Sequence, residues 1–329
     1  MPPFVCNYYL TLRCNARCTF CDLWARPDQG LAQSDAVLRN IAQLPAAGVR
    51  IIDFTGGEPL LHPDLPLFLK SARACGLRTT VTTNGLLYPK RAADLKGLVN
   101  LLHFSLDAST AERHDALRGV PCFDQVMASL ELALSLGEKP ELLFTAAADN
   151  YLEVVPLAEL AGKLGLILIV NPAFEVTGTE GALNRRQLQE LVRLCDRPYV
   201  YLNGGVARLM LDGGNDPARP RCRAVSATVV ISPDDRLLLP CFHRVQDALP
   251  LAGDLRRALK SAERRVWLRR QGRMAFCRGC TINCYLAPSL PYRWDRYLAS
   301  FLPWMARYFY YKNRRPRAAD PFTPSKPAP

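Results

Sequence analysis

Three cysteines within eight residues constrain this chain more than any other feature. Cys14, Cys18 and Cys21 follow a C-x3-C-x2-C spacing directly after a strand-like segment. A [4Fe–4S] cluster is usually held by thiolates, and a loop that supplies three of them leaves one iron without a protein ligand. Such an iron can bind a small molecule, as the open position of a catalytic zinc site does. A zinc site and three unrelated buried cysteines are the alternative interpretations of this spacing.

Composition and charge indicate which partners and which cellular location to expect for this protein. The 329 residues include twelve cysteines, and the net charge of +12 with a pI near 9.3 favours an anionic partner such as nucleic acid, a lipid surface or a phosphorylated substrate. The sequence opens without a secretory apolar region, and no apolar run reaches the roughly 18 residues that a spanning helix needs. We therefore expect a cytoplasmic, reducing location, where clustered cysteines favour metal over disulfides.

Strand-like and helix-like segments alternate through the first 170 residues. This alternation predicts a parallel sheet with right-handed crossovers, closed into a partial (β/α)6 TIM-like barrel. Functional sites in such α/β folds lie at the carboxyl ends of the strands. The expected strands are Val5–Leu12, Arg50–Thr55, Arg78–Thr82, Leu101–Leu106, Leu142–Ala146 and Leu166–Val170, and the expected helices are Ser34–Ala46, Pro63–Cys75, Pro89–Lys96, Phe123–Leu136 and Leu152–Leu164.

Several of these strand ends bear glycines or short polar residues. The second strand ends in Gly56-Gly57-Glu58-Pro59, where two glycines allow the backbone to approach a ligand and a carboxylate can accept hydrogen bonds from an ammonium group. A plain strand-to-helix turn is the alternative. The next strand ends carry Thr83, Asn84, Ser105, Asp107 and Asn150, which could equally be ordinary caps.

The cysteine loop followed by Gly-Gly-Glu-Pro resembles the radical S-adenosylmethionine (SAM) superfamily. The resemblance implies that Cys14, Cys18 and Cys21 hold a [4Fe–4S] cluster whose fourth iron is chelated by SAM. One electron from the cluster would cleave SAM to methionine and a 5′-deoxyadenosyl radical, which abstracts hydrogen from a substrate. The resemblance also assigns SAM contacts, to the methionine amine, ribose, carboxylate or adenine, to Phe20, Gly56, Gly57, Glu58, Thr83, Asn84, Ser105 and Asp107, with Asn150 as a further match.

A second group of cysteines lies in the last third of the chain. Segments 227–232 and 237–241 are predicted to form a hairpin that brings Cys222 and Cys241 together. A basic helix over about 255–272 then returns the chain to a C-x2-C pair and one further cysteine. Two plus two thiols make a closed four-ligand site, formed by Cys222, Cys241, Cys277 and Cys280, with Cys284 free or able to replace one of them.

This second group resembles the SPASM and shorter Twitch auxiliary-cluster domains of radical SAM enzymes. Five cysteines fit the shorter, one-cluster type, which implies a second [4Fe–4S] cluster; a structural zinc is the alternative. The expected domains are a core barrel over 1–215, an auxiliary-cluster domain over 216–288, and an aromatic and basic helical tail over 289–329. The four isolated cysteines are expected to be structural, and the histidines show no ligand spacing; these cysteines are Cys6, Cys75, Cys122 and Cys195.

The tail combines aromatic residues with arginines. An aromatic stripe on one helical face can lie in a membrane interface, or it can pack back on the barrel. The stripe consists of Trp294, Tyr297, Leu298, Phe301, Trp304 and Tyr308. Pro303 is expected to kink the helix, and the last ten residues are expected to be disordered.

These features predict a radical SAM enzyme, an oxidoreductase or maturase, that abstracts hydrogen from a peptide, lipid-linked or small-molecule substrate. Its expected partners are an electron donor such as flavodoxin or ferredoxin and a membrane surface contacted peripherally through the tail. Because the barrel begins near residue 5, we expect no peptide-recognition domain ahead of it. A methyltransferase or epimerase acting on a small metabolite is a second enzyme class. The remaining alternative is a non-catalytic iron–sulfur or zinc protein that binds nucleic acid through its basic surface.

Overall fold

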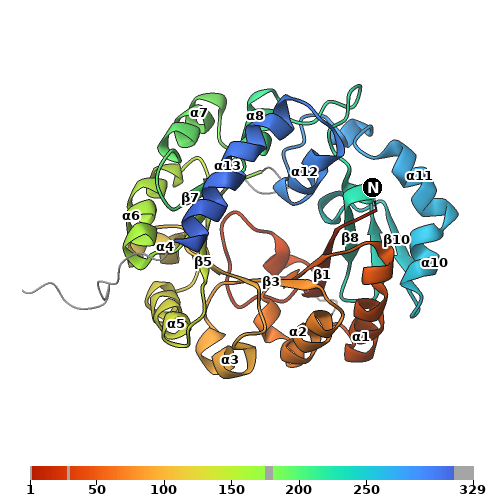
Figure 1. Cartoon of the computed structure of the whole chain (residues 1–329), viewed down its shortest axis with the longest axis horizontal. Coiled ribbons are helices and arrows are strands. Elements are labelled where there is room, and N and C mark those ends of the chain that lie inside the picture. The colour runs from red at the N-terminus through yellow and green to blue at the C-terminus, as the bar shows by residue number, and fades with distance from the viewer. Residues whose placement is uncertain (1, 28–29, 175–180, 315–329) are drawn as a thin grey trace, which may run out of the picture.

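A single curved sheet organises the molecule. The computed structural model describes residues 2–27, 30–174 and 181–314 (Figure 1). Ten strands occur in the order β10-β9-β8-β1-β2-β3-β4-β5-β6-β7. Neighbouring strands from β8 through β1 to β7 pair in parallel, whereas β9 pairs antiparallel with both β8 and β10. The predicted α/β fold with a partial barrel is confirmed. The strands are β1 (Val5–Thr11), β2 (Ile51–Gly56), β3 (Arg78–Thr83), β4 (Leu101–Ser105), β5 (Glu141–Ala146), β6 (Leu168–Pro172), β7 (Val200–Leu202), β8 (Thr228–Ile231), β9 (Arg236–Leu239) and β10 (Asp247–Pro250).

Helices surround the sheet on its outer side (Figure 1). Alternation along β2 shows why: Ile52 and Phe54 are fully buried under the helices, whereas Asp53 and Thr55 face the barrel interior and are only partly covered. The barrel interior is therefore polar, and the main core lies between sheet and helices. The helices are α1 (Ser34–Gln43), α2 (Leu65–Ala74), α3 (Tyr88–Leu95), α4 (Ala111–Arg118), α5 (Phe123–Ser135), α6 (Val154–Leu164), α7 (Arg185–Leu194), α8 (Gly204–Leu211), α9 (Ala224–Ala227), α10 (Leu255–Lys260), α11 (Ala262–Arg270), α12 (Asn283–Ser289) and α13 (Arg296–Asn313).

The structure contains elements that the sequence did not predict and alters two that it did. The strands β7 and β10 and the helices α4, α7, α8, α9 and α12 are additional. The predicted basic helix over 255–272 is two helices, because Ser261 caps α11 through a hydrogen bond from the Arg264 N–H. The helix predicted over Ser34–Ala46 begins at Ser34 but ends at Gln43, and the Ser34 hydroxyl donates to Asp64.

The predicted hairpin forms, and it extends the barrel sheet. Strand β8 pairs in parallel with β1, with Val5 opposite Thr228, and β9 folds back on β8. The hydrogen bond from Phe4 N–H to the Ala227 carbonyl continues this pairing. The segment around the second cysteine group is therefore joined to the start of the chain by main-chain hydrogen bonds.

Helix α13 crosses the barrel and packs along α8 and β7 (Figure 1). Leu298 is buried, and the Tyr308 ring contacts the Tyr201 ring at 5.3 Å. The predicted aromatic stripe thus faces the protein, except Trp294, which precedes the helix and is 87% exposed. Pro303 lies inside one continuous helix. The last ten residues, predicted to be disordered, lie outside the described residues.

Candidate active site

The cysteine loop after β1 opens onto a cavity of about 200 Å³ at the carboxyl ends of the strands. All three thiols of the motif line it, so the structure brings together three soft sulfur donors on one wall of an open space. This donor set fits a [4Fe–4S] cluster with one iron left for another ligand. Ten residues predicted for the site line this cavity: Cys14, Cys18, Phe20, Cys21, Gly56, Gly57, Glu58, Thr83, Asn84 and Ser105.

Glycines hold the cysteine loop against the end of β2. The N–H of Gly57 donates to the Thr11 carbonyl at 2.9 Å, and the Glu58 N–H donates to the Arg13 carbonyl at 2.9 Å. A Cβ atom on Gly57 would lie 2.1 Å from the Arg13 carbonyl oxygen. Only glycine permits this approach, so the second motif sets the position of the loop that bears Cys14.

The Glu58 carboxylate joins two strand ends. It accepts hydrogen bonds from the Thr83 hydroxyl and the Asn84 N–H, both at 2.9 Å, and from the Leu60 N–H at 3.1 Å. Burial raises the pKa of Glu58 to about 7, although these three donors oppose the rise. The carboxylate is 1% exposed, and the contacts that it makes within the chain position backbone around the cavity.

Thiol sulfurs of the motif receive polar contacts from the protein. The Ala16 N–H donates to Cys14 Sγ at 3.5 Å, and the Asn84 side chain lies 3.9 Å from the same sulfur. Burial raises the pKa of Cys14 and of Cys21 to about 11 in the metal-free chain. Donors aimed at sulfur stabilise the thiolate form that a metal requires.

Arg118 is a site residue that sequence reasoning missed. Its guanidinium contacts the Asp107 carboxylate at 2.5 Å and donates to Cys18 Sγ at 3.5 Å, and it lies 5.6 Å from the centre of the Phe20 ring. It lines the same cavity as the three thiols. No sequence signal indicated it, because its helix α4 was not predicted and its partner Cys18 lies 100 residues away.

Asp107 and Asn150 do not line the cavity. Asp107 is fully buried behind it, and its Oδ1 accepts the Thr145 N–H at 2.8 Å. Asn150 is also fully buried; its side-chain oxygen accepts the Ala147 N–H at 2.7 Å and its amide donates to the Thr145 carbonyl at 3.0 Å. Both residues therefore support the strand ends from behind.

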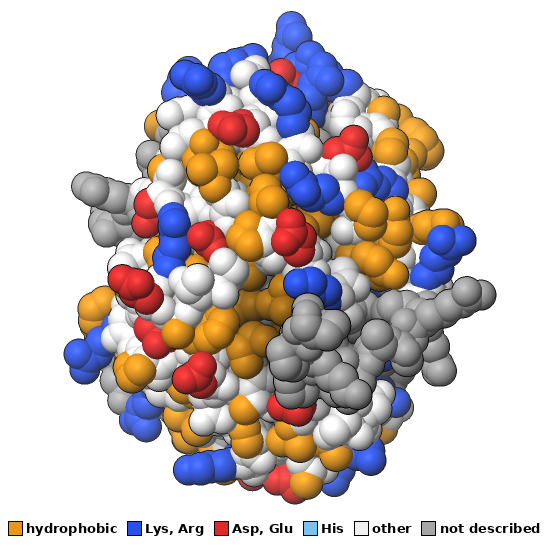
Figure 2. Space-filling model, turned by 90° about the vertical axis from the view of Figure 1, so that its left-hand side faces the viewer, with side chains coloured by type: hydrophobic (Ala, Val, Ile, Leu, Met, Phe, Trp, Pro, Cys, Tyr) orange, Lys and Arg blue, Asp and Glu red, His pale blue; other side chains and the backbone are white. Residues whose placement is uncertain are grey.

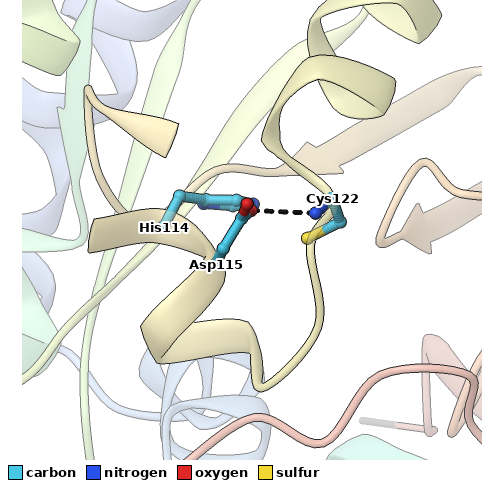
Figure 3. A group of neighbouring side chains, drawn as sticks. All are labelled: His114, Asp115 and Cys122. Atoms are coloured by element: carbon cyan, nitrogen blue, oxygen red, sulfur yellow. Dashed lines mark hydrogen bonds between the residues drawn. The ribbon is translucent and has the colours of Figure 1, made fainter. Parts of the chain in front are cut away.

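A cluster of His114, Asp115 and Cys122 lies next to this support (Figure 3). Their potential ligand atoms lie within 4.8 Å of one another. The Asp115 carboxylate accepts the N–H groups of Cys122 and Phe123, each at 2.8 Å, and His114 Nδ1 accepts the Asp107 N–H at 3.1 Å. These bonds join the start of α5 to the loop that bears Asp107, and we assign no metal to the cluster.

The second cysteine group also converges. Burial raises the pKa of Cys222, and the neighbouring Cys280, Cys241 and Cys277 thiols raise it further. The same mutual effect acts on Cys241, whose pKa rises to about 12. Four partly buried thiols from three segments are thus close enough to affect one another's pKa, and Cys222, Cys241 and Cys280 pack against one hydrophobic cluster. Four thiols are a donor set that suits a closed [4Fe–4S] or zinc site.

Asn215 ties the Cys222 segment to the segment of Cys277 and Cys280, and it was not among the residues predicted for this site. Its Oδ1 accepts the Cys222 N–H at 3.0 Å, and its amide donates to the Cys277 carbonyl at 3.1 Å. Its own N–H donates to the Cys280 carbonyl at 3.0 Å. The side chain is 1% exposed, so it acts as a buried clamp.

Cys284 lies apart from those four thiols. The residue as a whole is exposed, but the surrounding protein desolvates its thiol, and this desolvation followed by the Asp53 carboxylate raises the pKa of Cys284 to about 11. Asp53 itself lies on the barrel interior with one carboxylate oxygen that has no hydrogen-bond partner among the described residues, and burial raises its pKa to about 6.

Fold and site together define a parallel partial-barrel protein in which a loop of three cysteines lines a cavity at the carboxyl ends of the strands. The family model described as the radical SAM superfamily matches residues 8–147, which contain the loop and the glycine motif. Over this region, which is less than half of the chain, the sequence is similar to the radical SAM superfamily. Members require a [4Fe–4S] cluster and SAM.

Relatives by sequence match about half of the chain. An AdoMet-dependent heme synthase of Methanosarcina barkeri is 30% identical over 170 residues, which cover 50% of this chain and 49% of that protein. A GTP 3′,8-cyclase of Corynebacterium glutamicum is 34% identical over 166 residues, covering 46% and 44%. The chain thus aligns with about half the length of these relatives.

Solved structures share the fold over a longer span. Streptococcus suis SuiB bound to S-adenosylmethionine superposes with a TM-score of 0.66 at 20% identity, covering 81% of this chain and 65% of that one. Native anSMEcpe with bound AdoMet superposes with a TM-score of 0.63 at 16% identity, covering 94% and 97%. At this identity the likeness concerns the fold.

Proposed function

We propose that this protein is a radical SAM enzyme that cleaves SAM reductively and abstracts hydrogen from a bound substrate. The observation that supports it most directly is that Cys14, Cys18 and Cys21 share one cavity with Gly57 and Glu58. When bound, a [4Fe–4S] cluster would supply the electron that cleaves SAM and so generate the 5′-deoxyadenosyl radical. A flavodoxin or ferredoxin would be a suitable reductant.

The residues around the cavity would hold SAM rather than react with it. Gly56 and Gly57 present backbone at the closest approach, and Glu58 keeps the ends of β2 and β3 in register. Thr83, Asn84 and Ser105 offer polar atoms at the next strand ends. Phe20 offers a flat apolar face for the adenine, and Arg118 beside it keeps positive charge near Cys18.

We also propose an auxiliary cluster held by Cys222, Cys241, Cys277 and Cys280, in a SPASM/Twitch-like segment over 216–288 between the core over 1–215 and the tail over 289–329. The mutual effect of these four thiols on their pKa values supports this ligand set. Cys284 would be free, because Asp53 rather than another thiol is its charged neighbour.

Three neighbouring cavities lie between the two cysteine groups and would provide a place for the substrate. The cavity of the cysteine loop shares Cys21 and Thr145 with a cavity of about 220 Å³, which shares Ala173 and Ala182 with a third of about 420 Å³ that reaches Cys280. Arg185, Arg244 and Arg278 line the third cavity, and none of the described residues that line it is acidic.

The substrate of this site would therefore carry phosphate or carboxylate groups. A small metabolite, a peptide with acidic side chains or a lipid-linked phosphate would each meet this requirement. SuiB has been solved with its precursor peptide SuiA, which makes a peptide one of the substrates to test.

Spectroscopy of the reduced protein tests the cofactor proposal. Anaerobically reconstituted protein should give a [4Fe–4S] signal in electron paramagnetic resonance that shifts when SAM is added. The Cys14→Ala variant should lose that response, whereas Cys284→Ala should retain it. A wild-type signal that does not change when SAM is added would overturn the proposal.

A further inference from the structure

Helix α13 is held on the protein by its inner face. The Tyr308 hydroxyl donates to the Glu141 carboxylate at 2.6 Å, and Lys312 pairs with the same carboxylate. Trp304 lies so close to Gly204 that a Cβ there would meet its ring at 2.2 Å. These contacts fix the helix and determine which side it presents outward.

The outer face of α13 is apolar. Leu302, Phe309 and Tyr310 are 50%, 50% and 49% exposed, and their spacing places them on one side of the helix. Ala299, Pro303 and Ala306 are exposed between them. The solvent face of an ordinary surface helix is polar, so this apolar row, Ala299 to Tyr310, lacks the usual pattern.

Positive charge accompanies the apolar row. No residue of α13 from 296 to 313 is acidic, whereas Arg296 and Arg314 are exposed near its two ends. Arg296 pairs with Asp212 at 3.0 Å, and the Arg314 guanidinium lies 4.2 Å from the centre of the Tyr310 ring. An apolar strip with cations near its ends is complementary to a lipid surface that carries negative charge.

We propose that the outer face of α13 docks on an anionic membrane surface. The exposed leucine and aromatic side chains would enter the interface between headgroups and acyl chains, and the arginines would contact lipid phosphates. No helix of the described ranges is long and apolar enough to cross a membrane, so the contact is peripheral. Figure 2 views the molecule from the left-hand side of Figure 1, and hydrophobic side chains gather in its upper right part with Lys and Arg side chains among them.

Vesicle sedimentation with full-length reconstituted protein tests this surface. Vesicles of equal parts phosphatidylcholine and phosphatidylglycerol should retain the wild type, phosphatidylcholine vesicles should not, and added salt should weaken retention. The double variant Leu302→Glu/Phe309→Glu should bind at least about tenfold more weakly. The matched control is Leu67→Glu/Leu152→Glu, since both leucines are similarly exposed elsewhere, at 46% and 54%.

The proposal would be overturned if the wild type showed no preference for anionic vesicles, or if the control variant lost as much vesicle binding as Leu302→Glu/Phe309→Glu. It would also be overturned if the wild type did not bind vesicles but formed a dimer that Leu302→Glu/Phe309→Glu dissociates. Iron content and SAM cleavage in solution should be the same in all variants. The docking surface and the radical SAM activity can therefore fail independently of each other.

Discussion

The Arg118 guanidinium lies 2.5 Å from the Asp107 carboxylate, and both side chains are shielded from solvent. Arg118 also donates to Cys18 Sγ. This pair therefore connects the end of strand β4 to the cysteine loop, and it supplies positive charge beside a thiolate ligand of the proposed cluster.

Removing Arg118 alone should destabilise the protein strongly. In Arg118→Met the fully buried Asp107 loses its charge partner, which typically costs about 3–5 kcal/mol. Urea denaturation of the metal-free protein measures this, and Arg113→Ala, which removes an exposed ion pair, should cost less than about 1 kcal/mol. The double variant Asp107→Asn/Arg118→Met should recover much of the loss; if it is no more stable than Arg118→Met, the buried pair is not the cause.

Gly57→Ala should disturb the cysteine loop. The added methyl group would sit 2.1 Å from the Arg13 carbonyl oxygen, so the loop must move, at a cost of about 1–3 kcal/mol. Iron retention in the first site should fall. Gly162→Ala is the matched control. Gly162 lies within α6, and the nearest atom outside the helix, on the Tyr199 ring, would be 3.9 Å from the new Cβ, so this change should be neutral or stabilising. Full iron retention in Gly57→Ala would contradict the close approach.

Single cysteine variants should separate the ligands of the second site from Cys284. Two [4Fe–4S] clusters correspond to about eight irons per chain. Cys280→Ala should reduce this to about four irons, whereas Cys284→Ala should leave it unchanged because Cys284 lies apart from the other four thiols. Equal iron loss in both variants would place Cys284 among the ligands. Zinc in place of half the iron would make the second site a structural metal site.

Glu141 should make the packing of α13 against the rest of the protein depend on pH. Burial alone would raise its pKa, but hydrogen bonds and charges from His103 and Lys312 outweigh burial and lower the pKa to about 2. A carboxylate whose pKa is lowered on folding stabilises the native state above its unfolded pKa of about 4.5, and this stabilisation is lost as pH falls toward 2. The stabilisation that is lost when Glu141 becomes protonated amounts to roughly 3 kcal/mol.

The measurement is the free energy of unfolding between pH 6 and pH 3 for the wild type and Glu141→Gln. The wild type should lose stability over this range more steeply than the variant, which lacks the titrating group. Parallel curves for the two proteins would show that Glu141 does not hold the helix through its charge.

Sequence patterns were sufficient for the barrel and for most of the cavity, because each signal was local. The cysteine spacing, the two glycines and the short polar residues at strand ends all occur within a few residues of the atoms that they position. Alternation of strands and helices indicated that these strand ends meet at one edge.

Contacts between segments that are distant in the sequence could not be predicted from local sequence patterns. Arg118 contacts Cys18 across 100 residues of sequence, and Asn215 joins the Cys222 segment to the segment of Cys277 and Cys280. The pairing of β8 with β1 was missed for the same reason, since strand composition does not name the partner strand. For Asp107 and Asn150 the strand-end position was recognised, but burial on the far side of the backbone was not.

Formation of 5′-deoxyadenosine tests the central proposal most directly. Anaerobically reconstituted protein would be mixed with dithionite and SAM, and the products would be measured for the wild type and for the variant in which Cys14, Cys18 and Cys21 are replaced by alanine. The account predicts 5′-deoxyadenosine and methionine from the wild type and none from the variant. Wild-type protein that holds iron but does not cleave SAM, or a triple variant that cleaves it equally well, would contradict it.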